Sequence, residues 1–278
     1  MKLSIITINY NNCTGLKKTI DSVICQTWRD FEWIIIDGGS TDGSKELILS
    51  LNDNPDANLI YWCSEPDKGI YNAMNKGVCH AVGEYLVFMN SGDAFADKDT
   101  LTKIFEEGYT ADIIIGRTIS WDDGRIVSSR NSDEVSPFLH LLYSSYPHQA
   151  TLIRRTLLQK YPYVEDYKIV SDWKFWMDAI VFGECSIAFS DVIVAKFDME
   201  GISNANSELN NLERKDVLRS YFPPMVLKDL GIYMNLRLDT VVNNSQYLLY
   251  HSRPLYIFLR KLSSLMVKVH RLFSNATH

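Results

Sequence analysis

The chain has 278 residues, of which 46% are hydrophobic, and a formal net charge of −6 at pH 7. This length and composition allow a sizeable core in one large domain, or in one domain with an appendage. The negative charge argues against nucleic acid as the main partner, because a phosphate backbone requires a basic face.

The first part of the chain alternates strand and helix. Short β-branched apolar runs that end in polar residues predict buried strands, and apolar residues at helical spacing between them predict helices. The predicted strands cover residues 3–8, 31–36, 59–63 and 85–89. They begin about 28 residues apart, which indicates parallel strands joined by helical crossovers on both faces of a sheet.

A polar loop follows each of these strands at its carboxyl end. The fourth strand is ended by Asn90, Ser91, Gly92 and Asp93, small polar residues that predict a tight turn. A carboxylate just past the end of a central parallel strand lies in the crevice where open α/β sheets bind ligands. Asp93 is therefore the first functional candidate, and we expect the polar loops to converge on one edge.

The alternation is lost after about residue 112. Strands are predicted at 113–117 and 125–129 around a hairpin turn at 121–124, followed by a helix at 170–182 and a last strand at 187–197. From residue 207 the pattern is helical, with a break between helices at Pro223 and Pro224. We predict an α/β domain over residues 1–205 and a helical C-terminal region over 206–278.

The C-terminal region carries a basic segment, since no Asp or Glu follows Asp239. Apolar and basic residues between positions 253 and 273 fall on opposite faces of a predicted helix. Two interpretations are equally open: the helix lies on an anionic membrane surface, or it packs on the core with a solvated basic face.

Localisation is predicted from three absences in the sequence. The N-terminus has no secretory signal pattern, and no run of about 18 apolar residues occurs. The five cysteines are odd in number and form no Cys-x-x-Cys pair, so a zinc site or redox dithiol is not expected. These features predict a cytoplasmic protein with reduced thiols, peripheral on the cytoplasmic face of the inner membrane if the basic helix binds lipid.

Several motifs in order make the chain similar to a known family. No Gly-x-Gly-x-x-Gly follows the first strand and no P-loop motif occurs, so ordinary dinucleotide and P-loop sites are disfavoured. The segments at 4–11, 21–27, 37–43, 65–77, 83–85 and 90–93 instead resemble family 2 inverting glycosyltransferases, in particular bacterial enzymes of polysaccharide synthesis. The resemblance covers roughly residues 2–200 and implies the GT-A fold, with a mostly parallel central sheet flanked by helices.

The resemblance places a nucleotide site at the ends of the first two strands. It implies that Ile8 and Tyr10 line the base and that Asp37 accepts a hydrogen bond from the base or ribose. The family often has a second acid directly after this one, where the chain has Gly38. Asp37 therefore serves alone or the base contact differs, and the alternative role for Asp37 is a turn or helix cap.

Residues of the following loop and helix complete the implied nucleotide site. Asp67 and Lys68 match the loop that approaches the base and the diphosphate, and Asn75 lies on the next helix. A lysine beside a diphosphate gains a charge-assisted contact. The alternative is that Lys68 is an exposed turn residue.

The resemblance also implies a divalent cation. Ser91, Gly92 and Asp93 stand where the family has an Asp-x-Asp or Ser-Asp-Asp triplet, of which only the last acid is retained. Asp93 is expected to bind Mn²⁺ or Mg²⁺ between the two phosphates, and Ser91 and Gly92 to contact the donor. The alternative for Asp93 is a plain turn residue.

The acceptor side is implied by two later motifs. Asp172, in the segment 171–176, becomes the candidate base that takes a proton from the acceptor hydroxyl; the alternative is a helix cap. Trp173 and Trp176 are candidates to stack on a sugar or to fill the core. His148, in a motif that continues to Arg154 and Arg155, is expected to touch the diphosphate, the metal or the acceptor, or to be structural.

These motifs predict an inverting glycosyltransferase. We expect a nucleotide-sugar donor, UDP-linked, and a saccharide or lipid-linked saccharide as the acceptor in surface polysaccharide synthesis. Two alternatives stay open. One is a non-catalytic nucleotide-sugar-binding or scaffold protein, suggested by Gly38 and Gly92 in place of acids. The other is a sugar nucleotidyltransferase, although the Gly-rich, Lys-bearing loop of that class is not visible.

Overall fold

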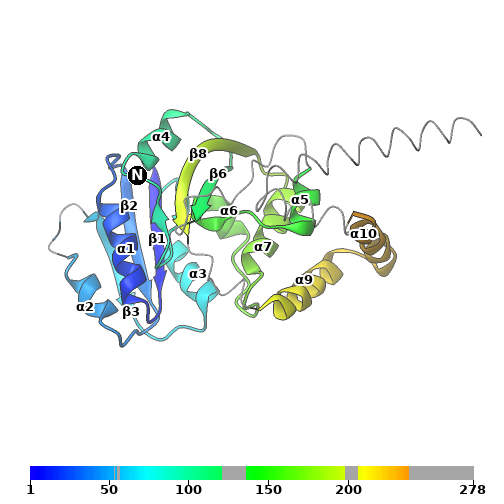
Figure 1. The fold of residues 1–278 in the computed structure, drawn as a ribbon, viewed down its shortest axis with the longest axis horizontal. Coiled ribbons are helices and arrows are strands. Elements are labelled where there is room, and N and C mark those ends of the chain that lie inside the picture. The colour runs from blue at the N-terminus through cyan, green and yellow to red at the C-terminus, as the bar shows by residue number, and fades with distance from the viewer. Residues whose placement is uncertain (53, 55–56, 121–135, 198–205, 238–278) are drawn as a thin grey trace, which may run out of the picture. The chain divides into compact units, whose positions relative to one another are not determined.

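The computed structural model describes the chain except residues 53, 55–56, 121–135, 198–205 and 238–278. Its N-terminal part alternates strand and helix as predicted (Figure 1). The strands are β1 (Leu3–Asn9), β2 (Phe31–Asp37), β3 (Leu59–Ser64) and β4 (Tyr85–Phe88). The helices between them are α1 (Cys13–Ile24), α2 (Ser44–Leu49) and α3 (Ile70–His80).

These four strands are parallel, as their regular spacing predicts. β1 pairs with β2 and β4, and β2 pairs with β3. Every residue of β1, β2 and β4 is buried, which explains why the runs are apolar throughout and do not alternate. Their carboxyl ends therefore lie at one edge of the sheet.

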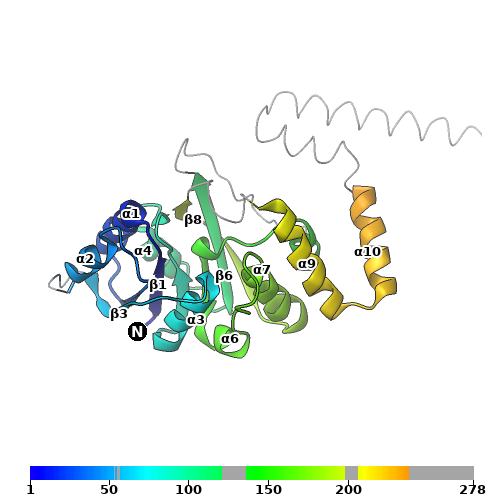
Figure 2. The same ribbon diagram turned by 90° about the horizontal axis from the view of Figure 1, so that it is seen from below.

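Helices cover both faces of these strands. Leu16, Ile20 and Val23 of α1 share one hydrophobic core with Ile5 and Trp33 of the sheet. α3 contacts β1 and β2, and both views place β1 between α1 and α3 (Figures 1 and 2). The crossovers thus bury the sheet on two sides, and only its edges and loops remain for ligands.

The second half of the sheet is mixed. It contains β5 (Ala94–Phe95), β6 (Ile113–Ser120), β7 (Thr151–Arg154) and β8 (Ile187–Phe197). The strand order is β3-β2-β1-β4-β7-β6-β8-β5, and β7 is antiparallel to both neighbours. The predicted strands at 113–117 and 187–197 are confirmed, whereas the predicted hairpin turn and the strand at 125–129 lie outside the described residues.

Short helices connect the strands of this half. They are α4 (Thr100–Glu106), α5 (Pro137–Tyr143), the 3₁₀ turn η2 (His148–Ala150) and α6 (Arg155–Lys160). The helix predicted at 170–182 is observed as α7 (Ser171–Trp176), which continues into the π-helical segment η3 (Met177–Phe182).

The C-terminal helices are α9 (Ser207–Tyr221) and α10 (Pro224–Arg237). The chain divides into two compact units, Met1–Val217 and Leu218–His278, so most of α9 belongs to the first unit. Among the described helices, none combines the length and the hydrophobicity that crossing a bilayer requires. The basic segment at 253–273 lies outside the described residues, and its membrane role stays a prediction.

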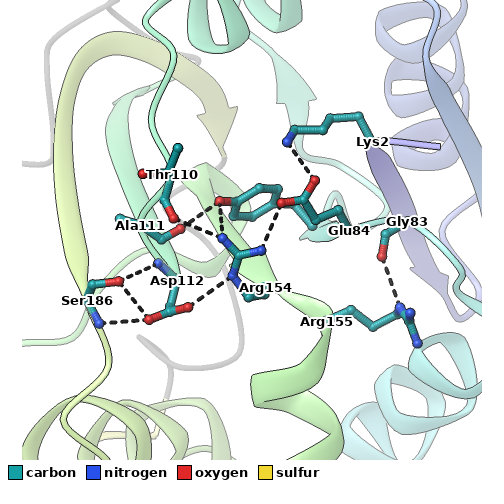
Figure 3. Close-up of polar contacts among 10 residues, drawn as sticks. Lys2, Gly83, Glu84, Thr110, Ala111, Asp112, Arg154, Arg155 and Ser186 are labelled. Carbon is teal, nitrogen blue, oxygen red and sulfur yellow. Dashed lines mark hydrogen bonds and ion pairs between the residues drawn. The ribbon is translucent and has the colours of Figure 1, made fainter.

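A polar network fastens the amino end of β4 to β7 and β6 (Figure 3). The Arg154 guanidinium donates to Asp112 at 3.0 Å, to Glu84 at 2.8 Å and to the Tyr85 hydroxyl at 3.0 Å. In the antiparallel register of β4 and β7, Arg154 lies opposite Tyr85, the first residue of β4. Arg154 and Arg155 therefore lie at the end of the sheet opposite to residues 90–93.

We expect Arg154→Met to lower the free energy of unfolding by about 1–3 kcal/mol, since several charge-assisted bonds are lost in a partly solvent-screened site. Hydrogen bonds from Lys2 and Arg154 lower the pKa of Glu84, and those from Ser186 and Arg154 lower the pKa of Asp112. The stabilisation is present above the usual carboxyl pKa values and is lost as pH falls through the lowered ones. The difference between variant and wild type should therefore narrow below about pH 4 in urea unfolding.

The neighbouring arginine supplies the control for this experiment. Arg155 donates from Nε to the Gly83 carbonyl at 3.0 Å and lies in the same view (Figure 3). Arg155→Met should cost less than half as much stability at neutral pH. Equal costs for the two variants would show that the Arg154 network contributes nothing beyond a single hydrogen bond.

Candidate active site

The loops after β1, β2 and β4 meet at the carboxyl edge of the sheet, as the sequence predicts. Asn9 Nδ2, at the end of β1, donates to Asp37 Oδ1 at the end of β2 over 2.7 Å. Asn12 Nδ2, in the loop after β1, donates to the Ser91 carbonyl after β4 over 3.0 Å. The end of β1 and the loop that follows it are thus bonded to the polar residues after β2 and after β4.

The turn at 90–93 holds Asp93 at this edge. The Thr19 hydroxyl of α1 donates to the Asp93 carbonyl at 2.6 Å and accepts from the Gly92 amide at 3.1 Å. Gly92 has φ +106°, a conformation that residues with a Cβ rarely adopt, so the backbone itself disfavours an acid at this position. The Asp93 side chain is half-buried. No motif indicated that Thr19 would support this turn.

His148 lies between Asp172 and the turn that carries Asp93. Its Nδ1 lies 3.5 Å from Asp172 Oδ2, and its Nε2 lies 3.3 Å from Asn90 Nδ2 in the turn that carries Asp93. Burial lowers the pKa of His148, but the hydrogen bond and charge of Asp172 and the charge of Asp93 raise it to a net value above 6.5. Both carboxylates therefore act on the same imidazole.

Asp172 lies in the first turn of α7 and is held by two donors. Its Oδ1 accepts from the Tyr71 hydroxyl at 3.1 Å and from the Trp173 amide at 2.8 Å. Its Oδ2 faces His148, and the Asp172 side chain is 19% exposed to solvent. An oriented, hydrogen-bonded carboxylate that solvent still reaches can accept a proton from a bound hydroxyl. Tyr71 was not among the predicted site residues.

Asp37 is fully buried beneath this edge. Its two oxygens accept hydrogen bonds from Asn9 Nδ2, the Ser40 hydroxyl and amide, and the Ser64 hydroxyl. Burial raises the pKa of Asp37, but the bonds from Ser40, Ser64 and Asn9 outweigh this effect and bring the net pKa below 3.8. The carboxylate is ionised and already bonded to four protein donors, as expected for an acid that organises the loops.

Asp67 lies directly over Gly38. A Cβ built on Gly38 would lie 2.7 Å from Asp67 Oδ2 and 3.0 Å from Cδ2 of Tyr10. The carboxylate of Asp67 thus occupies the space that a side chain at position 38 would need. Tyr10 is 66% exposed and Ile8 is 6% exposed, so of these two residues only Tyr10 offers a broad surface to a ligand.

Two other predicted nucleotide ligands differ in their surroundings. Lys68 is exposed, and its ammonium pairs with no carboxylate in the part of the chain that the structure describes. The Asn75 amide instead bonds the loop before α7: it donates to the Tyr163 carbonyl at 2.8 Å and accepts from the Tyr163 amide at 3.1 Å. Lys68 is available to an anion, whereas Asn75 is engaged within the protein.

Trp173 packs inside the protein beside the candidate base. It is 2% exposed, and its indole Nε1 donates to the Leu141 carbonyl at 2.7 Å. Arg214 of α9 lies over its ring, with Cζ 4.7 Å from the centroid. Trp176 is fully buried. These positions favour the core alternative for both tryptophans, and they bring Arg214 near Asp172, which no motif predicted.

The donor set fits a cation that also binds phosphate. Among the described residues, no group of three or more His, Cys, Asp or Glu side chains is arranged to hold a metal. Asp93 offers one carboxylate, whereas both ring nitrogens of the nearby His148 already face Asp172 and Asn90. Mg²⁺ is often held by one or two carboxylates together with substrate phosphates and water, and this set meets that need.

Comparison with known proteins agrees with this geometry. The model of the family "Glycosyl transferase family 2" matches residues 4–167. A PGL/p-HBAD biosynthesis glycosyltransferase of Mycobacterium bovis (strain BCG / Pasteur 1173P2) is 30% identical over 216 residues, covering 76% of this chain and 82% of that protein. An uncharacterised glycosyltransferase of Mycobacterium tuberculosis (strain CDC 1551 / Oshkosh) is 29% identical, covering 80% and 85%.

Two solved structures share the fold. S. aureus TarS 1–349 in complex with UDP-GlcNAc has a TM-score of 0.62 at 22% identity. The match covers 74% of this chain and 61% of the TarS fragment. A mannosyltransferase from Pyrobaculum calidifontis with GDP-Man and Mn²⁺ has a TM-score of 0.60 at 16% identity, covering 96% and 80%. The fold is that of GT-A transferases, and the chain belongs to glycosyl transferase family 2.

Proposed function

We propose that this glycosyltransferase moves a sugar from a nucleoside diphosphate donor to a hydroxyl group with inversion at the anomeric carbon. The observation that carries the proposal is the position of His148, which lies 3.5 Å from Asp172 on one side and 3.3 Å from Asn90, in the turn that carries Asp93, on the other. A candidate base and a candidate cation ligand therefore lie within one site. Inverting transfer by a single displacement needs these two groups on opposite sides of the reacting carbon.

The chemical step uses the protein's own groups as follows. The acceptor oxygen forms a bond to the anomeric carbon while its proton passes to Asp172, and the bond to the diphosphate oxygen breaks. His148, bonded to Asp172 Oδ2 and adjacent to the 90–93 turn, orients the carboxylate. A divalent cation held by Asp93 would neutralise the charge that develops on the departing diphosphate.

The donor is proposed to bind along the edge formed by the loops after β1, β2 and β3. Tyr10 is exposed there and Asp67 fills the space above Gly38, so Asp67 would supply the acid that position 38 lacks. The exposed ammonium of Lys68 would meet the diphosphate. The solved relatives bind UDP-GlcNAc or GDP-Man with Mn²⁺, which supports a nucleotide sugar, UDP-linked in our proposal, with Mn²⁺ or Mg²⁺.

The acceptor is proposed to be a saccharide or a lipid-linked saccharide of surface polysaccharide or glycolipid synthesis. The Mycobacterium bovis relative is named for PGL/p-HBAD biosynthesis. An acceptor in the membrane would suit a peripheral enzyme, and the basic segment at 253–273 would then attach it to anionic lipid.

Thermal unfolding with UDP, GDP and dTDP sugars, each with and without Mn²⁺, tests the proposal. A ligand that binds only the native state raises Tm. We expect one nucleotide class to do so, more strongly with Mn²⁺, and to yield nucleoside diphosphate and a glycoside of inverted configuration by NMR. A retained configuration would contradict the mechanism. Binding without turnover on any hydroxyl acceptor would favour a scaffold protein, and pyrophosphate release from a nucleoside triphosphate would favour a nucleotidyltransferase.

A further inference from the structure

Helix α9 contributes a buried carboxylate to the segment that precedes the candidate base. Glu213 is 9% exposed. Its Oε1 accepts from the Lys168 amide at 2.8 Å, and its Oε2 accepts from the amides of Ile169 at 3.0 Å and Val170 at 3.2 Å. These three residues lead directly into α7, whose second residue is Asp172.

The segment has no comparable support of its own. Val170 is the N-cap of α7 and provides no side-chain cap. The amides of the N-cap residue and of the two residues before it would lose these partners without Glu213, and a carboxylate in this place also complements the positive end of the helix. The beginning of α7 therefore depends on a residue that lies more than forty positions later in the chain.

A second element holds the same segment through its carbonyl. The Tyr71 hydroxyl of α3 lies 2.6 Å from the Ile169 carbonyl and 3.1 Å from Asp172 Oδ1. Ile169 is thus held at its amide by Glu213 and at its carbonyl by Tyr71. A shift of this residue would move Asp172 relative to both Tyr71 and His148.

We propose that Glu213 is a positioning residue for Asp172, which makes α9 part of the catalytic unit. The inference rests on the proposed role of Asp172 as the base. The first compact unit extends to Val217 and so includes Glu213. Because a displacement of about 1 Å in a catalytic group can cost roughly 100-fold in rate, three hydrogen bonds to the adjoining backbone suffice to control turnover.

Glu213→Gln, which keeps the shape but removes the charge, tests the proposal in the full-length protein. We expect kcat to fall by roughly 10- to 100-fold while the KM for the donor changes by less than about twofold, because the donor site is not altered. Hydrogen exchange at the amides of residues 168–170 should become faster. Glu213→Asp, which retains the charge on a shorter side chain, should recover part of kcat and remains informative if the Gln variant does not fold.

Asp216 provides a matched control on the same helix. It is exposed, and its Oδ2 accepts from the Tyr167 hydroxyl at 3.0 Å without touching the backbone of 168–170. Asp216→Asn should leave kcat and amide exchange within about twofold of wild type. Full kcat in Glu213→Gln beside an inactive Asp172→Asn would overturn this inference alone, whereas full activity of Asp172→Asn would overturn the proposed function.

Discussion

Asp172→Asn is expected to lower kcat for sugar transfer by about 10²- to 10⁴-fold, the usual contribution of a general base. The amide oxygen can still accept from Tyr71 and the Trp173 amide, so the site should keep its shape. The change removes the ability to take the acceptor proton, and with it the negative charge that faces His148. Initial rates at saturating donor measure the loss of kcat, and the Kd of the nucleotide measures whether the site has kept its shape.

Asp178→Asn is the matched control for this change. Asp178 lies on η3 in the same helical run, accepts from Lys174 Nζ at 2.7 Å, and has a side chain 21% exposed against 19% for Asp172. It should transfer sugar at nearly the wild-type rate. If Asp172→Asn were also within about twofold of wild type, the base would have to be another group.

The parallel half of the sheet could be predicted because its signal is local. Each of β1, β2 and β4 is a wholly buried run that ends in small polar residues, and the carboxyl ends of parallel strands share one edge. The shared edge of these strands carries both Asp93 and Asp37. Because β1 lies between β2 and β4 at this edge, Asn9 can bond Asp37 on one side and Asn12 can bond Ser91 on the other.

The contacts that support Asp172 could not be predicted because they join distant parts of the chain. Tyr71 has the spacing of a core residue on α3 and shows no sign that its hydroxyl reaches α7. Glu213 stands in a helix rich in charged residues, where a carboxylate is normally solvated. Only the tertiary structure shows that its side chain is buried against a backbone segment.

Motif position also gives no information about the direction of a side chain. Asn75 follows the Asp67-Lys68 loop on the next helix, which suits a nucleotide ligand, yet its amide bonds Tyr163. Trp173 adjoins Asp172 and is nonetheless buried beneath Arg214. A residue beside a functional position can equally well hold the neighbouring loop, and the chemistry of its side chain fits both roles.

Asp93→Asn is expected to abolish the effect of Mn²⁺ on donor binding and to lower transfer by about 10³-fold or more, because a cation at the leaving group contributes several kcal/mol in the transition state. The change removes a negative charge but keeps the backbone bonds of the turn to Thr19. The protein should therefore fold normally. Titration of the nucleotide by calorimetry, with and without Mn²⁺, measures the cation-dependent part of the affinity.

Asp97→Asn serves as the control for the cation experiment. Asp97 is an exposed acid shortly after Asp93, and it forms an ion pair with Lys103 at 2.6 Å. Replacing Asp97 should leave the Mn²⁺ dependence intact. It should also leave the protein folded, since a surface ion pair of this kind contributes at most about 1 kcal/mol to stability. An Asp93→Asn variant that still requires Mn²⁺ as wild type does would place the cation on other ligands. Loss of Mn²⁺ dependence in both variants would instead indicate a general effect of negative charge along this segment and not a ligand at position 93.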